Sequence, residues 1–186
     1  MTTFIDEKKV DEYLTRLRQG DSSALDPLYE ASSKQLYSIC YSYLHDPHDS
    51  ADALSDTYLA IVKNIEKFRG DNGYNWIYTI AKNTSLNIIR EKKKTISVDF
   101  NDEETVNVLH LESEDAPKID DESGVVAIAK RILNEKEFRV VILHAVNGLK
   151  FKEIAKLVGG LESSIRWQYN NSLKKIKNAY ERRNAE

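Results

Sequence analysis

Apolar and polar positions recur with the period of an α-helix along most of this chain. Between residues 74 and 94, five apolar or small side chains share one flank at about 100° per residue. These are Ile77, Ile80, Ala81, Thr84 and Ile88. The pattern predicts an amphipathic helix that buries this flank.

A second stripe on the same predicted helix carries groups suited to nucleic acid. Its members are Trp76, Thr79, Asn83, Asn87 and Arg90. An aromatic ring can stack on a base, amides can contact base edges, and a guanidinium can bind phosphate. Trp76 alone would more often be a core residue, but its register with the two asparagines, which are poor helix formers, favours a function.

Three further helices precede this one. The apolar period predicts helices over residues 8–19, 23–44 and 50–68. In the third, we expect burial of Leu54, Leu59, Ile61, Val62 and Ile65. Pro47 disfavours helix at the residue before it, so 45–49 is predicted to be a turn. Together the four helices predict a first domain, a four-helix bundle over residues 1–94.

A second helical domain is predicted over residues 125–186. Its expected helices span 125–133, 135–146, 151–158 and 162–182. Gly159 and Gly160 permit a tight turn, so the last two helices form a helix-turn-helix. The first of them offers Phe151, Ile154, Ala155 and Leu157 to the second, which is expected to bury Ile165, Tyr169, Leu173 or Ser172, and Ile176.

The first turns of the last helix are predicted to be exposed. They carry Ser163, Ser164, Arg166, Trp167 and Asn170, and Lys174 follows one turn later. In helix-turn-helix proteins this end of the second helix enters the major groove. Arg166 could contact guanine through two hydrogen bonds, which is worth about 1–3 kcal/mol of discrimination.

Charge is distributed unevenly between these segments. The net charge is −3, but residues 99–122 hold ten acidic residues and one basic residue, Lys118. The remainder of the chain is therefore basic. We expect an acidic, flexible linker over residues 95–124 between two all-α domains.

The sequence offers little for catalysis or metal binding. It has no nucleophile paired with a base and no glycine-rich phosphate loop, so we expect no catalytic residue, no enzyme and no cofactor. Cys40, His45 and His48 have no further ligand at suitable spacing, and no metal site is expected. A single cysteine suits a reducing, cytoplasmic environment, and no apolar run is long enough for a membrane span.

The two blocks resemble a bacterial RNA polymerase sigma factor of the extracytoplasmic-function (ECF) type. The first block contains NWIYTIAKNTSLNIIR, residues 75–90, which is similar to region 2 of that family. The segment from residue 133 to 176 resembles region 4. The resemblance covers nearly the whole chain and implies a transcription initiation factor that binds core RNA polymerase and promoter DNA.

The resemblance also implies roles for particular residues. Recognition and melting of the −10 element fall to Trp76, Lys82, Asn83, Asn87 and Arg90, with Lys82 and Arg90 on the DNA backbone. Docking on the clamp helices of the largest polymerase subunit falls to Asp52, Ser55 and Asp56. Binding of the −35 element falls to Ser163, Ser164, Arg166, Trp167, Asn170 and Lys174, while region 4 docks on the flap of the second-largest subunit. An anti-sigma factor is an expected partner.

Three positions depart from the family pattern. Ser55 stands where a glutamine is usual, and Gln168 and Asn171 stand where basic residues are usual. These changes predict altered core docking and weak or unusual −35 binding. Two alternatives therefore remain open: a helix-turn-helix regulator that acts without polymerase, and a sigma-like decoy or interaction protein.

Overall fold

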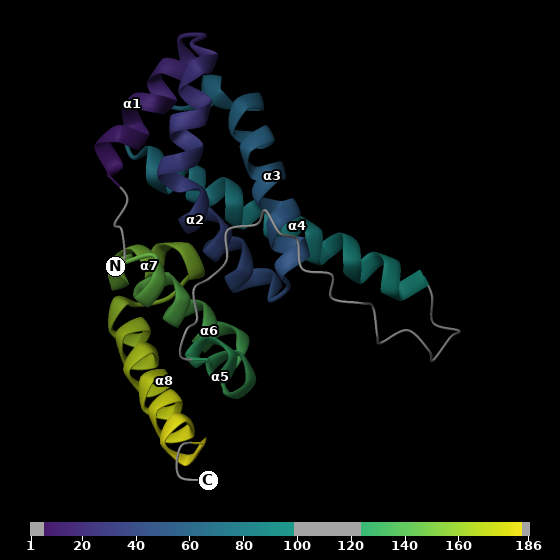
Figure 1. The fold of residues 1–186 in the computed structure, drawn as a ribbon, viewed down its shortest axis with the longest axis vertical. Coiled ribbons are helices and arrows are strands. Elements are labelled where there is room, and N and C mark those ends of the chain that lie inside the picture. Colours follow the sequence, from purple (N-terminus) through teal and green to yellow (C-terminus); the bar gives the residue numbers. More distant parts are fainter. Residues whose placement is uncertain (1–5, 99–123, 184–186) are drawn as a thin grey trace. The chain divides into compact units, whose positions relative to one another are not determined.

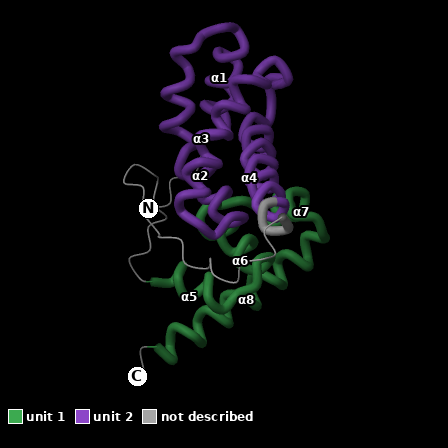
Figure 2. The backbone as a smooth tube through the Cα atoms, turned by 90° about the vertical axis from the view of Figure 1, so that its right-hand side faces the viewer, with its two compact units in different colours: residues 1–4, 118–186 green, residues 5–117 purple. Residues whose placement is uncertain are grey.

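The computed structural model describes residues 6–98 and 124–183, and its regular structure is helical (Figure 1). No strand occurs within these two ranges, so the predicted all-α fold is confirmed. The helices fall into two compact units, whose described residues are 6–98 in the N-terminal unit and 124–183 in the C-terminal unit (Figure 2). Most of the predicted acidic linker lies outside the described residues.

The N-terminal unit consists of four α-helices and two short 3₁₀ turns. The helices are α1 (Glu7–Arg18), α2 (Leu25–Leu44), α3 (Pro47–Lys63) and α4 (Gly73–Val98), and the turns are Ser22–Ala24 and Ile65–Lys67. Helices α2, α3 and α4 pack pairwise against one another, and α1 packs against α2 and α4. The C-terminal end of α4 extends beyond the other three helices (Figure 1). It continues four residues past the predicted end of the domain at Lys94.

Helix α3 begins earlier than the sequence predicts. The side chain of Asp46 accepts a hydrogen bond from the backbone N–H of Asp49 at 2.9 Å, and Pro47 occupies the first helical position. Proline is favourable there because its missing N–H would have no partner within the helix. The predicted turn over 45–49 is therefore wrong from Pro47 onward.

The three central helices meet at small polar side chains. Cys40 of α2, Thr57 of α3 and Ser85 of α4 are fully buried, and both hydroxyls are close enough to hydrogen-bond with the thiol. Each hydroxyl also donates to a carbonyl one turn earlier, Thr57 to Ala53 O at 2.6 Å and Ser85 to Ala81 O at 2.9 Å. The hydroxyls are thus satisfied without a bulky partner, which allows the helices to approach closely. Burial raises the pKa of the Cys40 thiol to about 11, so it is protonated at neutral pH.

The buried face of α4 is rotated from the predicted one. Ile77 and Ala81 are fully buried as expected, but Ile80, Thr84 and Ile88 are only half-buried. The remaining core positions of α4 are taken by Tyr74, Tyr78 and Ser85. Tyr74 and Tyr78 fill the core at the N-terminal end of α4, and the small Ser85 fits further along the helix. Side-chain size decides these positions, and a pattern of hydrophobicity does not report side-chain size.

The C-terminal unit is built on one long helix. Its elements are α5 (Val125–Ile132), α6 (Glu135–Val141), a π-helical turn (Ile142–Val146), α7 (Phe151–Val158) and α8 (Glu162–Arg183). Helices α5, α6 and α7 each pack against α8. The turn between α7 and α8 contains Gly159 and Gly160 at φ 81° and 131°, a region that favours glycine. Ser172 rather than Leu173 is buried in α8.

A nearly buried carboxylate joins α6 to α8. Glu137 is 7% exposed, and its Oε1 accepts a hydrogen bond from Lys175 Nζ at 2.6 Å. Its Oε2 accepts from the backbone N–H of Asn134 at 3.2 Å, which completes a capping box at the start of α6. Burial raises the pKa of Glu137, but these hydrogen bonds and the Lys175 charge outweigh it and hold the pKa below its ordinary value of 4.5.

The lowered pKa of Glu137 predicts acid sensitivity of the C-terminal unit. Its stabilising contribution is present above the ordinary carboxyl pKa and is lost as pH falls through the lowered value. We expect Glu137→Gln to lower the melting temperature at neutral pH. Between about pH 5 and about pH 3, the melting temperature of this variant should fall less than that of the parent. Fluorescence of Trp167 in a Trp76→Phe chain reports this unit. Glu135→Gln, at an exposed acid of the same helix, is the control, and a Glu137→Gln curve parallel to the parent's would contradict the assignment.

Candidate functional site

Helix α4 presents the predicted polar stripe on its open side. Thr79, Asn83, Asn87 and Arg90 are exposed, and Trp76 is half-buried. Arg90 Nη1 donates a hydrogen bond to Asn87 Oδ1 at 3.0 Å. The stripe is therefore a continuous polar surface with an aromatic ring at its N-terminal end.

A hollow of about 370 Å³ lies beside this stripe. Four stripe residues line it, together with Ile80 and Thr84 of α4 and with Ala60, Asn64 and Lys67. Its volume falls within the range of pockets that bind small organic molecules, so it can accept an unstacked base. Lys82 and Arg90 are not among the lining residues. The aromatic ring and the amides of the stripe thus line the hollow, and the two cations lie outside it.

Asn64 and Lys67 were missed by the sequence analysis. Lys67 Nζ donates to Asn64 Oδ1 at 2.7 Å, and Asn64 Nδ2 donates to Ala60 O at 2.8 Å. The two residues lie at the end of α3 and in the following 3₁₀ turn, where no helical period indicates which way a side chain faces. Only the clustering of polar residues between two helices could have drawn attention to them.

The Trp76 ring is supported from behind by another aromatic residue. The centroids of Phe68 and Trp76 are 5.4 Å apart with an interplanar angle of 41°. Phe68 is 2% exposed, so it anchors the half-buried Trp76 to the core. The indole therefore contacts the core through Phe68 and also lines the hollow.

Helix α3 presents a second exposed surface. Asp52, Ser55 and Asp56 lie on one side of the helix at helical spacing and are exposed. Leu59 and Val62 extend this side and are 69% and 46% exposed, so the prediction that they are buried is wrong. Their spacing from Asp52 and Asp56 could have revealed this, since all five fall on one face. We call these five residues the α3 surface.

Ser55 contributes little reach to the α3 surface. Its hydroxyl donates back to Ala51 O of the same helix at 3.2 Å. A glutamine, which is usual at this position in the family pattern, has a longer side chain that would extend away from the helix instead. The apolar pair of Leu59 and Val62 is thus the more prominent part of this face.

The N-terminal turns of α8 are exposed as predicted. The exposed residues include all six predicted −35 positions: Ser163, Ser164, Arg166, Trp167, Asn170 and Lys174. Arg166 Nη2 lies 3.0 Å from Glu162 Oε1, and its guanidinium carbon lies 5.1 Å from the centre of the Phe151 ring. An ion pair and a cation–π contact therefore orient the Arg166 head group.

An aromatic cluster supports Phe151 in turn. His144 stacks on Phe151 with centroids 4.2 Å apart, and Tyr169 contacts both rings. His144 Nδ1 is 2.7 Å from the carbonyl oxygen of Leu149, which fixes the imidazole. The sequence analysis placed Phe151 and Tyr169 in the interior but did not identify His144 as part of this support.

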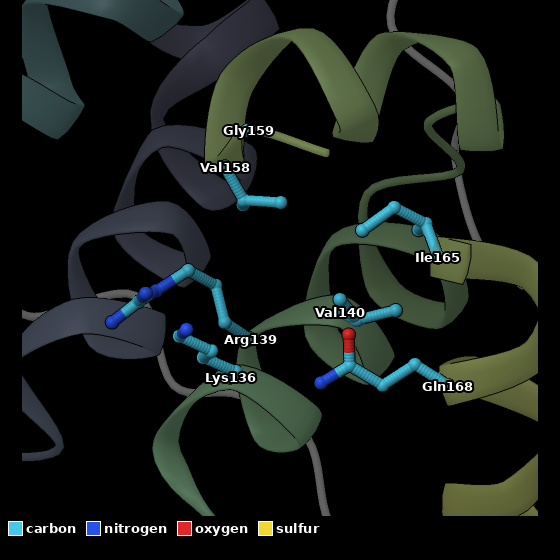
Figure 3. Close-up of a pocket in the computed structure, with 7 residues that line it drawn as sticks. All are labelled: Lys136, Arg139, Val140, Val158, Gly159, Ile165 and Gln168. Carbon is cyan, nitrogen blue, oxygen red and sulfur yellow. The ribbon is translucent and has the colours of Figure 1, made fainter. Parts of the chain in front are cut away.

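A small hollow of about 80 Å³ opens between α6 and α8 (Figure 3). Figure 3 shows apolar Val158 and Ile165 on one part of its lining and the polar Lys136, Arg139 and Gln168 on the other. Gln168 reaches from α8 toward α6. Two basic residues of α6, Lys136 and Arg139, thus line the same hollow as Gln168 of α8.

Metal and membrane features were also assessed within the described ranges. Residues 6–98 and 124–183 contain no group of three or more His, Cys, Asp or Glu side chains placed to bind a metal ion. No helix in these ranges is long and apolar enough to cross a bilayer.

Comparison with known families assigns the N-terminal unit. The model of sigma-70 region 2 matches residues 28–95, which include the α3 surface and the α4 stripe. The ECF RNA polymerase sigma factor SigW of Bacillus subtilis is 23% identical over 161 residues, covering 82% of this chain and 86% of SigW. The ECF RNA polymerase sigma-E factor of Haemophilus influenzae is 25% identical over 162 residues, covering 82% of this chain and 85% of that protein. Residues 28–95 are therefore a sigma-70 region 2, and the chain is similar to ECF RNA polymerase sigma factors over most of its length.

Solved structures of sigma factors share its fold. The structure of CnrH in complex with the cytosolic domain of CnrY matches with a TM-score of 0.60 at 14% identity, covering 91% of this chain and 96% of that chain. RpoE of Bartonella quintana, solved with the anti-sigma factor NepR, matches with a TM-score of 0.59 at 16% identity, covering 79% and 90%. The family model begins at Leu28, so α1 lies outside the matched region.

Proposed function

We propose that this protein is a sigma factor that binds core RNA polymerase, directs it to promoters with defined −10 and −35 elements, and melts the −10 region. The observation that carries this proposal is the hollow beside the α4 stripe, in which an aromatic ring and amides converge on a space that can accept a base. A regulator that binds only duplex DNA has no use for such a space. Its place of action is the cytoplasm, where its polymerase is.

Melting follows from the chemistry of the stripe. A base that leaves the duplex loses its stacking, at a cost of a few kcal/mol. Stacking on an aromatic side chain is worth about 1–3 kcal/mol per base, and hydrogen bonds to the base edge add selectivity. Trp76 supplies the stacking surface, and Asn83 and Asn87 supply the amides. Lys82 and Arg90 bind the backbone of the separated strand.

The α3 surface is the proposed contact with the polymerase clamp helices. Asp52 and Asp56 provide negative charge for basic partners, and Leu59 and Val62 provide apolar area. Charged residues around an apolar centre are typical of protein interfaces. Because Ser55 adds little, we propose that Leu59 carries a larger share of the binding free energy.

The C-terminal unit is the proposed −35 reader and flap-binding unit. Arg166, held by Glu162 and Phe151, is preorganised to contact guanine in the major groove. Ser163, Ser164, Trp167 and Asn170 lie on the same end of α8, and Lys174 suits a phosphate contact. Lys136 and Arg139 supply positive charge next to Gln168. An anti-sigma factor is the proposed inhibitory partner, as NepR is described as an anti-sigma factor in complex with RpoE.

Run-off transcription with bacterial core polymerase on host genomic fragments tests the proposal. Specific transcripts that require this protein would support it, and their aligned start sites would give the promoter. Core binding without transcripts would favour the decoy alternative. Failure of both would favour a regulator that acts without polymerase.

Asn83→Ala tests the assignment of the −10 stripe. Loss of its hydrogen bonds to a base should lower run-off yield at a native promoter by about 5- to 150-fold, which corresponds to about 1–3 kcal/mol. Core affinity, measured by fluorescence anisotropy, should not change. Asn178→Ala, at an exposed position late in α8, is the matched control. A normal yield from Asn83→Ala would refute the assignment.

Leu59→Asp tests the α3 surface. Burial of a leucine is worth about 1.5–3 kcal/mol, so the charged replacement should weaken core binding by at least about tenfold. Leu161→Asp makes the same change at another exposed leucine, next to the predicted −35 surface, and should preserve core affinity. Equal affinities for parent and Leu59→Asp in a core titration would exclude Leu59 from the interface.

A salt titration tests the −35 surface. Each phosphate contact adds about 0.9 to the slope of log K against log salt. Because Gln168 and Asn171 replace basic residues, binding of the protein to −35 duplexes should show a slope shallower than about −5, corresponding to fewer than about six contacts. A steeper slope would show that other cations replace the missing ones.

A further inference from the structure

Helix α1 contacts both ends of the loop that leads into α4. Asp11 Oδ1 accepts a hydrogen bond from the backbone N–H of Gly73 at 2.5 Å. Arg18 Nη1 donates to the carbonyl oxygen of Phe68 at 2.6 Å. Asp11 and Arg18 are seven residues apart and therefore share one face of α1. The four residues between Phe68 and Gly73 are thus held at both ends by one rigid helix.

The held loop has an unusual backbone. Gly70 has φ 95°, and Asn72 has φ 54°, a left-handed value that few residues other than glycine adopt. A conformation of this kind persists only where its surroundings impose it. A Cβ atom on Gly73 would come within 2.6 Å of Asp11 Oδ1 and Leu14 Cδ1, so a glycine is needed for this close approach to α1.

Both held ends lead to Trp76. The backbone N–H of Trp76 donates to the carbonyl oxygen of Asn72 at 3.0 Å. Arg18 binds the backbone carbonyl oxygen of Phe68, and the Phe68 ring packs against the indole. Movement of either end would therefore shift the tryptophan that borders the hollow.

We propose that Asp11 and Arg18 are positioning residues that fix Trp76 for promoter melting. The inference rests on the proposed role of Trp76. A stacking platform is effective only if its orientation is set before the base arrives, and the supporting residues determine that orientation. The carboxylate of Asp11 also lies at the N-terminus of α4, where negative charge is favourable, and this strengthens the contact.

Trp76 itself can report its own position. In a Trp167→Phe chain Trp76 is the single tryptophan, because the sequence has two. Quenching of its fluorescence by acrylamide measures exposure of the indole without any polymerase. Asp11→Ala and Arg18→Gln should increase quenching, and Asp11→Asn, which retains an oxygen acceptor, should remain close to the parent. Glu12→Ala and Lys8→Gln, at exposed positions of α1, are the matched controls.

Open-complex formation is measured on the same substitutions in a chain that keeps Trp167. Permanganate reactivity of −10 thymines should fall by about tenfold or more in Asp11→Ala and Arg18→Gln, the loss expected for one charge-assisted hydrogen bond. Core affinity should stay at the parent value, since the α3 surface is unchanged. Asp11→Asn should restore melting.

The outcomes separate this inference from the proposed function. Increased quenching together with reduced melting supports it, and unchanged quenching overturns it. The inference is also overturned if Trp76→Ala abolishes promoter melting while Asp11→Ala and Arg18→Gln leave promoter melting at the parent level. If Trp76→Ala leaves promoter melting at the parent level, the proposed function of Trp76 fails. Increased quenching in Asp11→Ala and Arg18→Gln would still establish that α1 positions the indole.

Discussion

The close approach of α2, α3 and α4 around Cys40 is the constraint on which the N-terminal unit depends. Thr57 and Ser85 are small enough to allow this approach, and their hydroxyls find acceptors within their own helices. Interiors are closely packed, so a larger side chain at any of these three positions would separate the helices. Separation would open the hollow, because its lining comes from both α3 and α4. A contact inside the core thus sets the shape of a surface site.

Helical periodicity was sufficient to predict that the helices exist and that most of the candidate site residues are exposed. Thr79, Asn83 and Asn87 share a stripe that can be deduced from spacing alone, and so do the α8 residues around Arg166. Leu59 and Val62 were misassigned because an apolar side chain is ordinarily taken to be buried. An exposed apolar residue is an exception that composition cannot distinguish from a core residue.

Other features depend on contacts between distant segments and could not be predicted from local pattern. Asn64 and Lys67 join the hollow only because the end of α3 meets α4. The hydrogen bond from Gly73 to Asp11 links residues 62 positions apart. The start of α3 was missed for a different reason, since Pro47 both ends one segment and begins the next.

The π-helical turn at Ile142–Val146 has a consequence for comparing this chain with its relatives. A π turn closes its hydrogen bonds over five residues rather than four, so it accommodates one more residue than an α-helix of the same path. His144, which stacks on Phe151, lies within this turn. A relative with an unbroken α-helix here would align with a one-residue gap, and beyond that gap equal positions in the two sequences would again occupy equal places in the fold.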